Sequence, residues 1–466
     1  ITMLYDVKTT RKLEKKIISQ NNPELSLMFK AGTAIFNHIK ELNKKDIIIL
    51  IGPGNNGGDG YALAIQAFLN NYNINCIELI ESKGISKQLK LLAKNLGIKI
   101  KKKLPDKKLV SKRSIIIDSI LGIGLSREPK GSILEAIKWT NSLKNKAYII
   151  SIDIPSGLNA SNGETFNNVV NADQTIMCLT QKQGCFTGQG PMYCGDIFFQ
   201  DLGFKNTEKI SKGTSYLLNG SEYKQLKRNR VSHKGTFGNL LIVGGYDGME
   251  GAANLSGLAA LRTGVGKVYI LNNSKIKNNE IIFIKNSLIE LKKILPKISA
   301  IVIGPGLGKN ADEVLRYLWK TNKPIVLDAD GLNWLSKNFN KKRTSETIYT
   351  PHHGEAKTLL NCKFSDRFKA IKKLKKKYGG TWILKGAGTI ILRKELFINN
   401  FSNSILSTAG TGDVLSGIVG GMLCQKIKKP EIKAVQIHTI CAKRILNNNN
   451  KTLIASDLIK EISKCI

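Results

Sequence analysis

The sequence has no run of about 18 consecutive apolar residues, the length that a membrane-spanning helix requires. The longest comparable stretch, residues 414–424, is too short and is interrupted by glycine. The first residues alternate charged and apolar side chains and lack the apolar core of a secretion signal. We therefore expect a cytoplasmic protein that has no membrane partner.

Cysteine and histidine are too few and too scattered to form a zinc site. The eight cysteines include no C-x-x-C pair, and the five histidines do not flank them at the spacing of metal ligands. Disulfides are not expected in a reducing compartment. We therefore interpret the cysteines as small buried apolar residues.

Acidic residues are scarce, since 35 Asp and Glu stand against 72 Lys and Arg and leave a net charge of +37. One interpretation is a nucleic-acid binder, because basic surfaces neutralise phosphate. The other is compositional drift, because Lys, Asn and Ile are abundant throughout the chain, including apparent helix surfaces such as residues 372–377. No zinc finger, RNA-binding aromatic motif or basic arm is present, so we favour drift and expect no specific nucleic-acid partner.

Short apolar runs alternate with segments of helical length through nearly all of the 466 residues, which is typical of parallel sheets with crossover helices. In the first half, the predicted strands are 46–51, 74–80, 114–118, 148–152 and 174–178. Helices are predicted between these strands, for example over 60–70 and 132–143. The pattern stops near residue 203, where a polar stretch rich in Lys and Asn begins.

The second half repeats this α/β pattern. Its predicted strands are 239–244, 267–271, 300–303, 324–327, 347–350 and 381–384, followed by a hairpin over 390–401. Its predicted helices include 251–263, 410–424, 431–447 and 455–464. With the boundary placed within 204–230, the sequence predicts two α/β domains, residues 1–212 and 213–466.

A glycine-rich turn, Gly52-Pro-Gly-Asn-Asn-Gly-Gly-Asp-Gly60, joins the strand 46–51 to a predicted helix. Its G-x-G-x-x-G pattern is that of a Rossmann-like fold, in which glycine lets backbone N–H groups approach phosphate. The same pattern also occurs in ordinary tight turns. Asn55, Asn56 and Asp59 add amide and carboxylate groups, which suit cation binding and acid–base chemistry.

Two further strand ends carry polar groups. Asp118 ends the strand before Gly122-Ile-Gly-Leu-Ser-Arg-Glu128, and Asp153 follows the next strand in Asp153-Ile-Pro-Ser-Gly157. Each aspartate alone is explained equally well as a cap of a helix or turn. Residues just beyond the carboxyl ends of parallel strands meet in one crevice, so their equivalent positions favour a shared site.

Together these three motifs resemble the epimerase half of the NAD(P)H-hydrate repair enzymes. The resemblance implies interconversion of the R and S epimers at C6 of hydrated NADH or NADPH, with Asp59 and Asp153 as candidate catalytic residues. It also implies a potassium ion held by Asn56, Asp118 and Ser156. The implied substrate contacts are Asn55, Asn56, Gly57, Gly58, Asp59, Gly122, Ile123, Gly124, Leu125, Ser126, Arg127, Glu128 and Asp153.

In the second half, Ala409-Gly-Thr-Gly-Asp413 begins a predicted helix. Consecutive backbone N–H groups at a helix N-terminus stabilise charge on a transferring phosphoryl group. Asp413 beside them can deprotonate a substrate hydroxyl, whose oxygen then attacks phosphorus. Taken alone, the segment is also explained as a helix cap with an acidic first turn. No G-x-x-x-x-G-K-[ST] motif is present, which excludes a P-loop.

Two other segments favour a phosphate site over a simple cap. Lys385, in Lys385-Gly-Ala-Gly-Thr389, can neutralise a diphosphate, and Glu355, in Pro351-His-His-Gly-Glu355, can help to place Mg²⁺. His352 is interpreted as a substrate contact, because no second metal ligand stands at helical spacing from it.

Over residues 223–465 these motifs resemble the ribokinase-like superfamily, and specifically its NAD(P)H-hydrate dehydratase branch. The resemblance implies a ribokinase-like α/β domain that dehydrates the S epimer to NAD(P)H, using Mg²⁺ and ADP and giving AMP and phosphate. The implied contacts of the hydrated cofactor are Ala253, Gly306, His352 and Asp413. The implied nucleotide contacts are Lys385, Gly386, Ala387, Gly388, Thr389 and Gly412.

Two positions depart from the family pattern: Phe29 stands where an acidic residue is usual, and Ala409 stands where a further glycine is usual. The main alternative function is a ribokinase-type small-molecule kinase with an accessory dinucleotide-binding domain; a non-catalytic binding module is another. A kinase has no need of the first domain, whereas an epimerase supplies a stereospecific dehydratase. The sequence leaves ADP or ATP open, the resemblance to fused bacterial enzymes favours ADP, and we expect a homo-oligomer.

Overall fold

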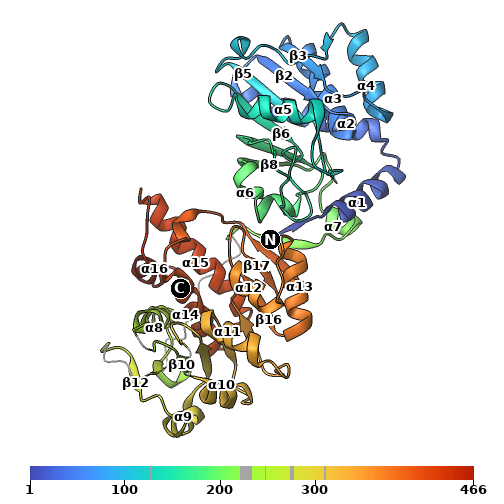
Figure 1. The fold of residues 1–466 in the computed structure, drawn as a ribbon. Helices are drawn as coiled ribbons and strands as arrows, with labels where there is room; N and C mark the ends of the chain where they lie inside the picture. The colour runs from blue at the N-terminus through green and yellow to red at the C-terminus, as the bar shows by residue number, and fades with distance from the viewer. Residues whose placement is uncertain (126, 221–233, 247, 273–277, 309–310) are drawn as a thin grey trace. The chain divides into compact units, whose positions relative to one another are not determined.

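The computed structural model describes residues 1–125, 127–220, 234–246, 248–272, 278–308 and 311–466. The chain divides into two compact units (Figure 1). One unit is Met3–Tyr216, and the other is Leu217–Ile466 together with Ile1–Thr2. The first unit thus ends four residues beyond the boundary expected at residue 212. Within the described ranges, no helix has the length and apolar character needed to cross a membrane.

The first unit is built on a seven-stranded sheet in the order β4-β3-β2-β5-β6-β7-β8, whose neighbours all pair in parallel. The strands are β2 Asp46–Ile51, β3 Asn73–Glu78, β4 Ile100–Lys101, β5 Ser114–Ser119, β6 Tyr148–Ile152, β7 Gln174–Cys178 and β8 Asp196–Gln200. The helices are α1 Val7–Ser19, α2 Glu24–Ile39, α3 Asn55–Leu69, α4 Gly84–Asn95, α5 Gly131–Asn141, α6 Gly190–Tyr193 and α7 Thr207–Ile210.

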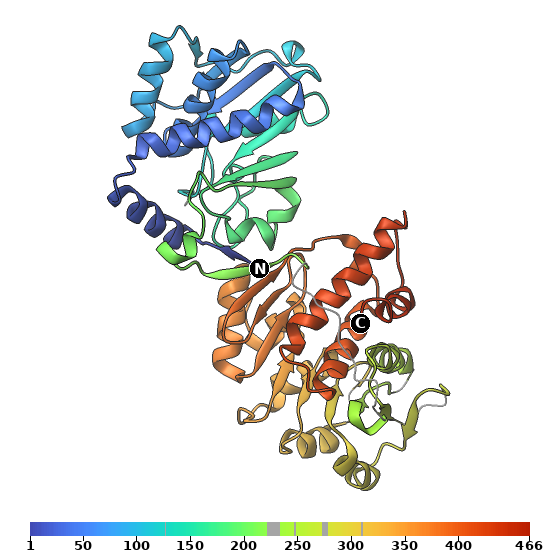
Figure 2. The ribbon, with the colours of Figure 1, turned by 180° about the vertical axis from the view of Figure 1, so that it is seen from behind.

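Helices cover both faces of this sheet because its central strands are apolar on both sides. Ile47, Ile49 and Ile51 of β2 join one core with α2 and α3, and the alternate residues Ile48 and Leu50 join another with α5. Helix α5 lies in front of the sheet in Figure 1, and α2 lies in front in the view from behind (Figure 2). This is the Rossmann-like parallel arrangement expected from the sequence.

An eleven-stranded sheet, in the order β1-β9-β18-β17-β16-β15-β14-β13-β10-β11-β12, supports the second unit. Neighbours from β16 to β12 are parallel, and β16, β17 and β18 pair antiparallel. The strands are β1 Thr2–Leu4, β9 Ser215–Leu218, β10 Asn239–Val243, β11 Lys267–Leu271, β12 Ile282–Ile284, β13 Ala300–Ile303, β14 Ile325–Leu327, β15 Thr347–Tyr349, β16 Thr381–Leu384, β17 Ile390–Leu392 and β18 Leu396–Asn399.

Helix α14, Thr411–Cys424, is the most buried helix that carries a predicted motif. A Cβ on Gly417 would lie 2.1 Å from the Ser256 carbonyl oxygen of α8, so glycine permits this close approach. The other helices are α8 Glu250–Arg262, α9 Leu288–Ile294, α10 Asp312–Trp319, α11 Ala329–Asn338, α12 His353–Leu360, α13 Arg367–Tyr378, α15 Pro430–Asn447 and α16 Ala455–Ile462.

The expected fold class, α/β in two domains, is confirmed, and most predicted strands agree with the observed ones within two residues. The helix predicted over 60–70 is wrong at its start, because α3 begins at Asn55. Two glycines are tolerated in its first turn because they allow close packing. A Cβ on Gly57 would lie 2.1 Å from the Gly52 oxygen, and one on Gly58 would lie 2.6 Å from the Met28 sulfur.

Candidate active sites

The first cavity lies in the unit Met3–Tyr216, beyond the carboxyl ends of β6 and β7, and side chains of α1, α2 and α3 complete it. The predicted residues Asn55, Asp59 and Asp153 meet there, as the positions after parallel strands indicated. The charged and amide groups that line it are Glu14, Glu24, Asn55, Asp59, Asp153 and Lys182.

A buried lysine pairs with Asp153. Lys182 Nζ donates to Asp153 Oδ1 and, at 2.9 Å, to the Cys178 carbonyl oxygen, and the lysine side chain is only 2% exposed. Asp153 has a φ of 67°, in the left-handed region that few residues other than glycine and asparagine adopt. Its N–H donates to the Ile176 carbonyl at 2.8 Å, which fixes the carboxylate at the end of the sheet.

Two other carboxyls in the cavity have raised pKa values. Burial, reinforced by the negative charges of Asp153 and Glu14, raises the pKa of Asp59 well above its usual range. Burial also raises the pKa of Glu14 to about 7, against the opposing effect of Lys182. Three carboxyls therefore share one buried lysine, and the cluster retains a proton near neutral pH.

The sequence analysis missed Glu14, Glu24 and Lys182, which belong to no motif. A signal for α1 was present, because the Asp6 side chain and Thr9 form a capping box, and Leu13 and Ile17 repeat at apolar helical spacing. Glu24 at the start of α2 accepts a hydrogen bond from Asn55 Nδ2 at 2.6 Å. The departure at Phe29 has a structural explanation, since that side chain packs against the apolar core.

The residues expected to hold potassium lie around one loop. Ser156 Oγ donates to Asp118 Oδ1 at 2.6 Å and accepts from the Leu121 N–H at 2.9 Å. A Cβ built on Gly122 would lie 3.3 Å from the Asn56 Cβ. The buried Asn56 carboxamide has no hydrogen-bond partner for either its oxygen or its nitrogen in the structure. A buried carboxamide oxygen without a partner is a ligand that suits a hard cation.

The structure places the first residue of the loop 122–128 next to the expected potassium ligand Asn56. Gly122 adjoins Asn56, and a Cβ on Gly124 would lie 3.7 Å from the Arg11 guanidinium of α1. Ile123 and Leu125 are half-buried, Arg127 is exposed, and Glu128 accepts a bond from Asn167 Nδ2 at 2.7 Å. Ser126 lies outside the described residues.

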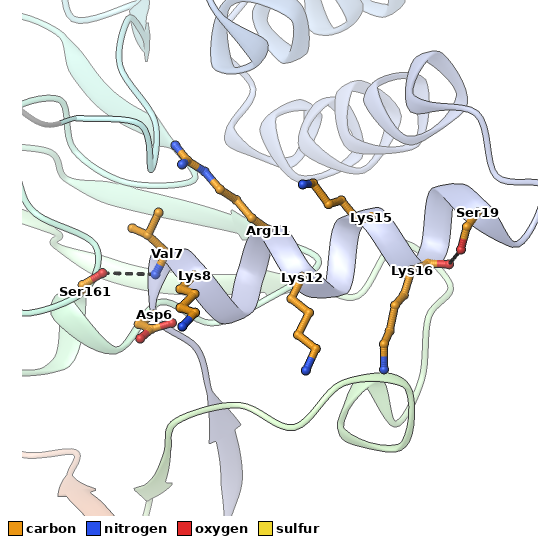
Figure 3. Close-up of a pocket in the computed structure, with 9 residues that line it drawn as sticks. All are labelled: Asp6, Val7, Lys8, Arg11, Lys12, Lys15, Lys16, Ser19 and Ser161. Carbon is orange, nitrogen blue, oxygen red and sulfur yellow. Dashed lines mark hydrogen bonds between the residues drawn. The ribbon is translucent and has the colours of Figure 1, made fainter.

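The outer side of α1 is strongly basic. Figure 3 shows Arg11 and Lys15 on one side of the helix, and Lys8, Lys12 and Lys16 on the other. These side chains line a groove of their own. Glu14 and Ile18, by contrast, line the first cavity.

The second cluster lies in the unit that begins at Leu217 and gathers at the ends of β14, β15 and β16. Lys385 Nζ donates to Asp328 Oδ1 at 2.7 Å and lies 3.9 Å from Glu355 Oε2. The same Nζ lies 3.4 Å from a Cβ built on Gly412, next to Asp413. Lys385, Glu355, Gly412 and Asp413, predicted from separate motifs, are thus brought together, and Asp328 is an additional member.

Burial dominates the titration of this cluster. It raises the pKa of Asp413 to about 7, with Asp328 adding to the shift and Lys385 opposing it. It likewise raises the pKa of Glu355 to about 7, again against Lys385. Burial alone would lower the pKa of Lys385, but Asp328 and Glu355 outweigh it and the pKa is raised. Lys385 therefore stays cationic.

His352 and Glu355 form a reciprocal cap at the start of α12. The Gly354 N–H donates to His352 Nδ1 at 2.9 Å, and the His352 N–H donates to Glu355 Oε2 at 2.7 Å. Burial and the charge of Lys385 lower the pKa of His352, so the ring is neutral with its proton on Nε2. The His352 side chain is 60% exposed, and its Nε2, which lies 3.4 Å from Glu355 Oε1, can donate to a ligand.

The buried side chain of Arg367 fixes the loop Lys385–Thr389 through hydrogen bonds to its backbone. Arg367 donates to the carbonyl oxygens of Leu384 at 2.9 Å, Lys385 at 3.1 Å, Ala387 at 2.5 Å and Gly388 at 3.2 Å. Its guanidinium therefore fixes the backbone of the expected nucleotide loop, and no motif in the sequence indicated it.

The two remaining predicted contacts lie at neighbouring strand ends. Ala253 of α8 is fully buried, and its Cβ lies 2.8 Å from a Cβ built on Gly245. Gly306 has a φ of 59° and accepts a bond from the Tyr246 N–H at 2.7 Å. Ala253 comes after β10 in the chain, and Gly306 comes after β13. These two strands continue the row β16-β15-β14, after whose strands Asp328 and Lys385 lie. A Cβ built on Gly306 would lie 3.2 Å from the Ala252 Cβ of α8, next to Ala253.

Comparison with known proteins assigns a family to each half. Residues 24–184 match the family described as YjeF-related protein N-terminus, and residues 240–464 match NAD(P)H-hydrate dehydratase. The chain is 32% identical, over 496 residues, to the bifunctional NAD(P)H-hydrate repair enzyme Nnr of Coxiella burnetii, covering 99% of both proteins. The chain belongs to the family of bifunctional NAD(P)H-hydrate repair enzymes. The resemblance inferred from the motifs is thereby confirmed.

Other members of this family are also similar. The Nnr enzyme of Escherichia coli is 34% identical over 86% of this chain and 81% of its own length. Among solved structures, the ADP/ATP-dependent NAD(P)H-hydrate dehydratase of Bacillus subtilis, co-crystallised with ATP and Mg²⁺, is 29% identical. It matches 51% of this chain and 92% of its own, with a TM-score of 0.46.

Proposed function

We propose that this repair enzyme epimerises hydrated NADH or NADPH at C6 in the first cavity and dehydrates the S epimer at the Asp413–Lys385 cluster. Membership of the family favours this function over a small-molecule kinase. The observation that carries the proposal is that Lys385 of one motif meets Gly412 and Asp413 of another in one half-buried cluster.

In the dehydratase half, Asp413 removes the proton of the C6 hydroxyl, and that oxygen attacks the terminal phosphorus of ADP, releasing AMP. Loss of phosphate and of a neighbouring C5 proton then restores NAD(P)H. Lys385 and the backbone N–H groups of Thr411–Asp413 offset the phosphate charge. His352 donates from Nε2 to the hydrated cofactor, and residues 386–389 shape the nucleotide site.

Mg²⁺ fits this half when it enters with the nucleotide. Glu355 offers one carboxylate, and phosphate oxygens complete the shell that Mg²⁺ prefers. Within the described part of the chain, no group of three His, Cys, Asp or Glu side chains is arranged to hold a metal alone. Bound Mg²⁺ supplies positive charge to the phosphates.

In the epimerase half, Asn55–Asp59 and the loop 122–128 bind the dinucleotide, and the Asp59, Asp153 and Lys182 side chains face the hydrated ring. Asn56, Asp118 and Ser156 hold potassium, which supplies positive charge beside the buried Asp118. This assignment is supported by the unpartnered carboxamide of Asn56. We further propose a cytoplasmic location, consistent with the lack of disulfides among the described cysteines, and a homo-oligomeric assembly.

The Asp413→Asn variant tests the proposal. It keeps the shape of the side chain and removes the base, so ADP-dependent dehydration should fall by about 10²–10⁴ while epimerisation continues. Recovery of the reduced-nicotinamide absorbance from acid-prepared NADH hydrate measures the first activity, and chromatography of the epimers measures the second. Asp312→Asn on the exposed start of α10 is the matched control. Near-normal dehydration by Asp413→Asn would make Asp413 only a helix cap.

A further inference from the structure

Helix α1 brings a carboxyl to the first cavity from outside every motif. Glu14 lies on the side of α1 between its buried residues and its basic residues, and it lines the cavity together with Asp59, Asp153 and Lys182. The helix is fixed at its start by the Asp6–Thr9 capping box and by a bond from the Val7 N–H to Ser161 Oγ at 3.1 Å (Figure 3). The position of Glu14 is therefore determined by the fold.

The charges that act on Glu14 come from α1, from α2 and from the segments after β6 and β7. Lys182 and Arg11 are the cations that act on it, and Asp153 and Glu24 are the nearby carboxylates that act on it. Lys182 is already paired with Asp153, so a second buried lysine is not available to Glu14. One carboxyl of the cluster therefore carries a proton at neutral pH without needing a partner cation.

We propose that Glu14 is a catalytic residue of the epimerase half, donating a proton to the hydroxyl at C6 and later recovering one. This inference rests on the proposed function above and adds to it the residue that carries the proton. Asp153 and Lys182 stay paired beside it and orient the hydroxyl.

The step is balanced without an oxidant or a second substrate. The carboxyl proton of Glu14 passes to the C6 hydroxyl, the C6–O bond breaks with its electron pair going to oxygen, and water leaves. The lone pair of the adjacent ring nitrogen forms a C=N⁺ bond to C6, next to the carboxylates of the cavity. Water then adds to either face of C6, the electron pair returns to nitrogen, and the extra proton returns to Glu14.

The environment favours Glu14 over Asp59 for this exchange. Burial and the negative charges of Asp153 and Glu14 raise the pKa of Asp59 well above its usual range, so Asp59 keeps its proton at neutral pH. The pKa of Glu14 is raised to about 7, so it can both give and take a proton at neutral pH. Asp59 then serves as a neutral hydrogen-bond donor to the substrate.

The test uses the full chain without nucleotide, so that dehydration is off, and starts from the separated R epimer. Glu14→Gln should lower the epimerisation rate by about 10² or more, whereas dehydration of the S epimer after ADP is added should be unchanged. Glu135→Gln, on the exposed side of α5, is the matched control. Glu14→Asp should restore part of the rate, because a carboxyl is again present.

Three outcomes overturn the inference. If the wild type epimerises and Glu14→Gln does so within about threefold at all pH values, Glu14 is not the proton carrier and the proposed function still stands. If the wild type itself does not epimerise, the proposed function fails with it. ¹³C carboxyl NMR of the wild type decides even if Glu14→Gln does not fold: titration of Glu14 near pH 7 supports the proposal, and an ordinary titration below pH 5 contradicts it.

Discussion

The charged side chains of the two sites are arranged in a similar way. Each site places one buried or half-buried lysine among several carboxyls: Lys182 among Glu14, Asp59 and Asp153, and Lys385 among Asp328, Glu355 and Asp413. In each, the lysine is paired with one aspartate, and burial raises the pKa of a neighbouring carboxyl, Glu14 or Asp413, to about 7. Groups poised in this way can exchange protons at physiological pH.

A pH dependence follows for the dehydratase half. Asp413 must be deprotonated to act as a base, and its pKa is raised to about 7 by burial and Asp328. The kcat/KM for the hydrated cofactor should therefore rise as pH increases from about 6 to about 8 and then level off, because this ratio reports the free enzyme. Rates measured at saturating ADP across this range check the prediction; a flat profile would contradict it.

The cation assignment makes a separate prediction at the residue scale. Replacing potassium in the buffer by a bulky organic cation should slow epimerisation and lower the melting temperature of the first unit, because the Asn56 carboxamide and Asp118 lose their counter-charge. Dehydration should not change. An Asn56→Ala variant whose epimerisation and melting temperature still respond to potassium as the wild type does would place the ion elsewhere.

At the scale of elements, the strand ends were predictable and the surroundings were not. The glycine-rich turns and the polar residues after strands could be predicted, because tight turns and parallel sheets restrict which residues can stand at these positions. Glu14 and Lys182 reach the cavity through the packing of α1 and of the segment after β7, which depends on contacts distant in sequence. The raised pKa values depend on burial in the same way, so the spacing of residues could not indicate them.

The hydrogen bonds from Arg367 to the loop Lys385–Thr389 lead to a prediction about a residue that no sequence motif indicated. Four carbonyl oxygens accept from the forked guanidinium of Arg367, a geometry that a lysine ammonium cannot reproduce. Arg367→Lys should raise the KM for ADP by about tenfold with a smaller effect on kcat, because the loop loses its support but the base remains. Arg316→Lys on the exposed face of α10 is the control. An equal fall in kcat with unchanged KM would contradict a positioning role.

For the whole molecule, each unit contains its own core and chemical cluster, while the short strands β1 and β9 span the division between the units. All residues that line the first cavity lie within Met3–Tyr216, and the Asp413–Lys385 cluster lies within Leu217–Ile466. The first unit includes the residues after 212 for a physical reason. Thr214 and Ser215 donate to Gln183 Oε1 at 2.8 and 2.9 Å, and the Thr214 N–H donates to the Leu4 carbonyl at 2.9 Å.

We therefore expect residues 1–216 and 217–466 to fold when expressed separately. With a mixture of the R and S epimers and ADP, the second fragment alone should consume the S epimer quickly and then slow to the spontaneous rate of epimerisation. Adding the first fragment should restore complete conversion. A first fragment shortened to residues 1–212 should melt at a lower temperature, because three buried or half-buried hydrogen bonds are lost. Equal melting temperatures of fragments 1–216 and 1–212 would place the end of the first folding unit at residue 212. Rapid consumption of both epimers by the second fragment alone would mean that the first unit performs another task.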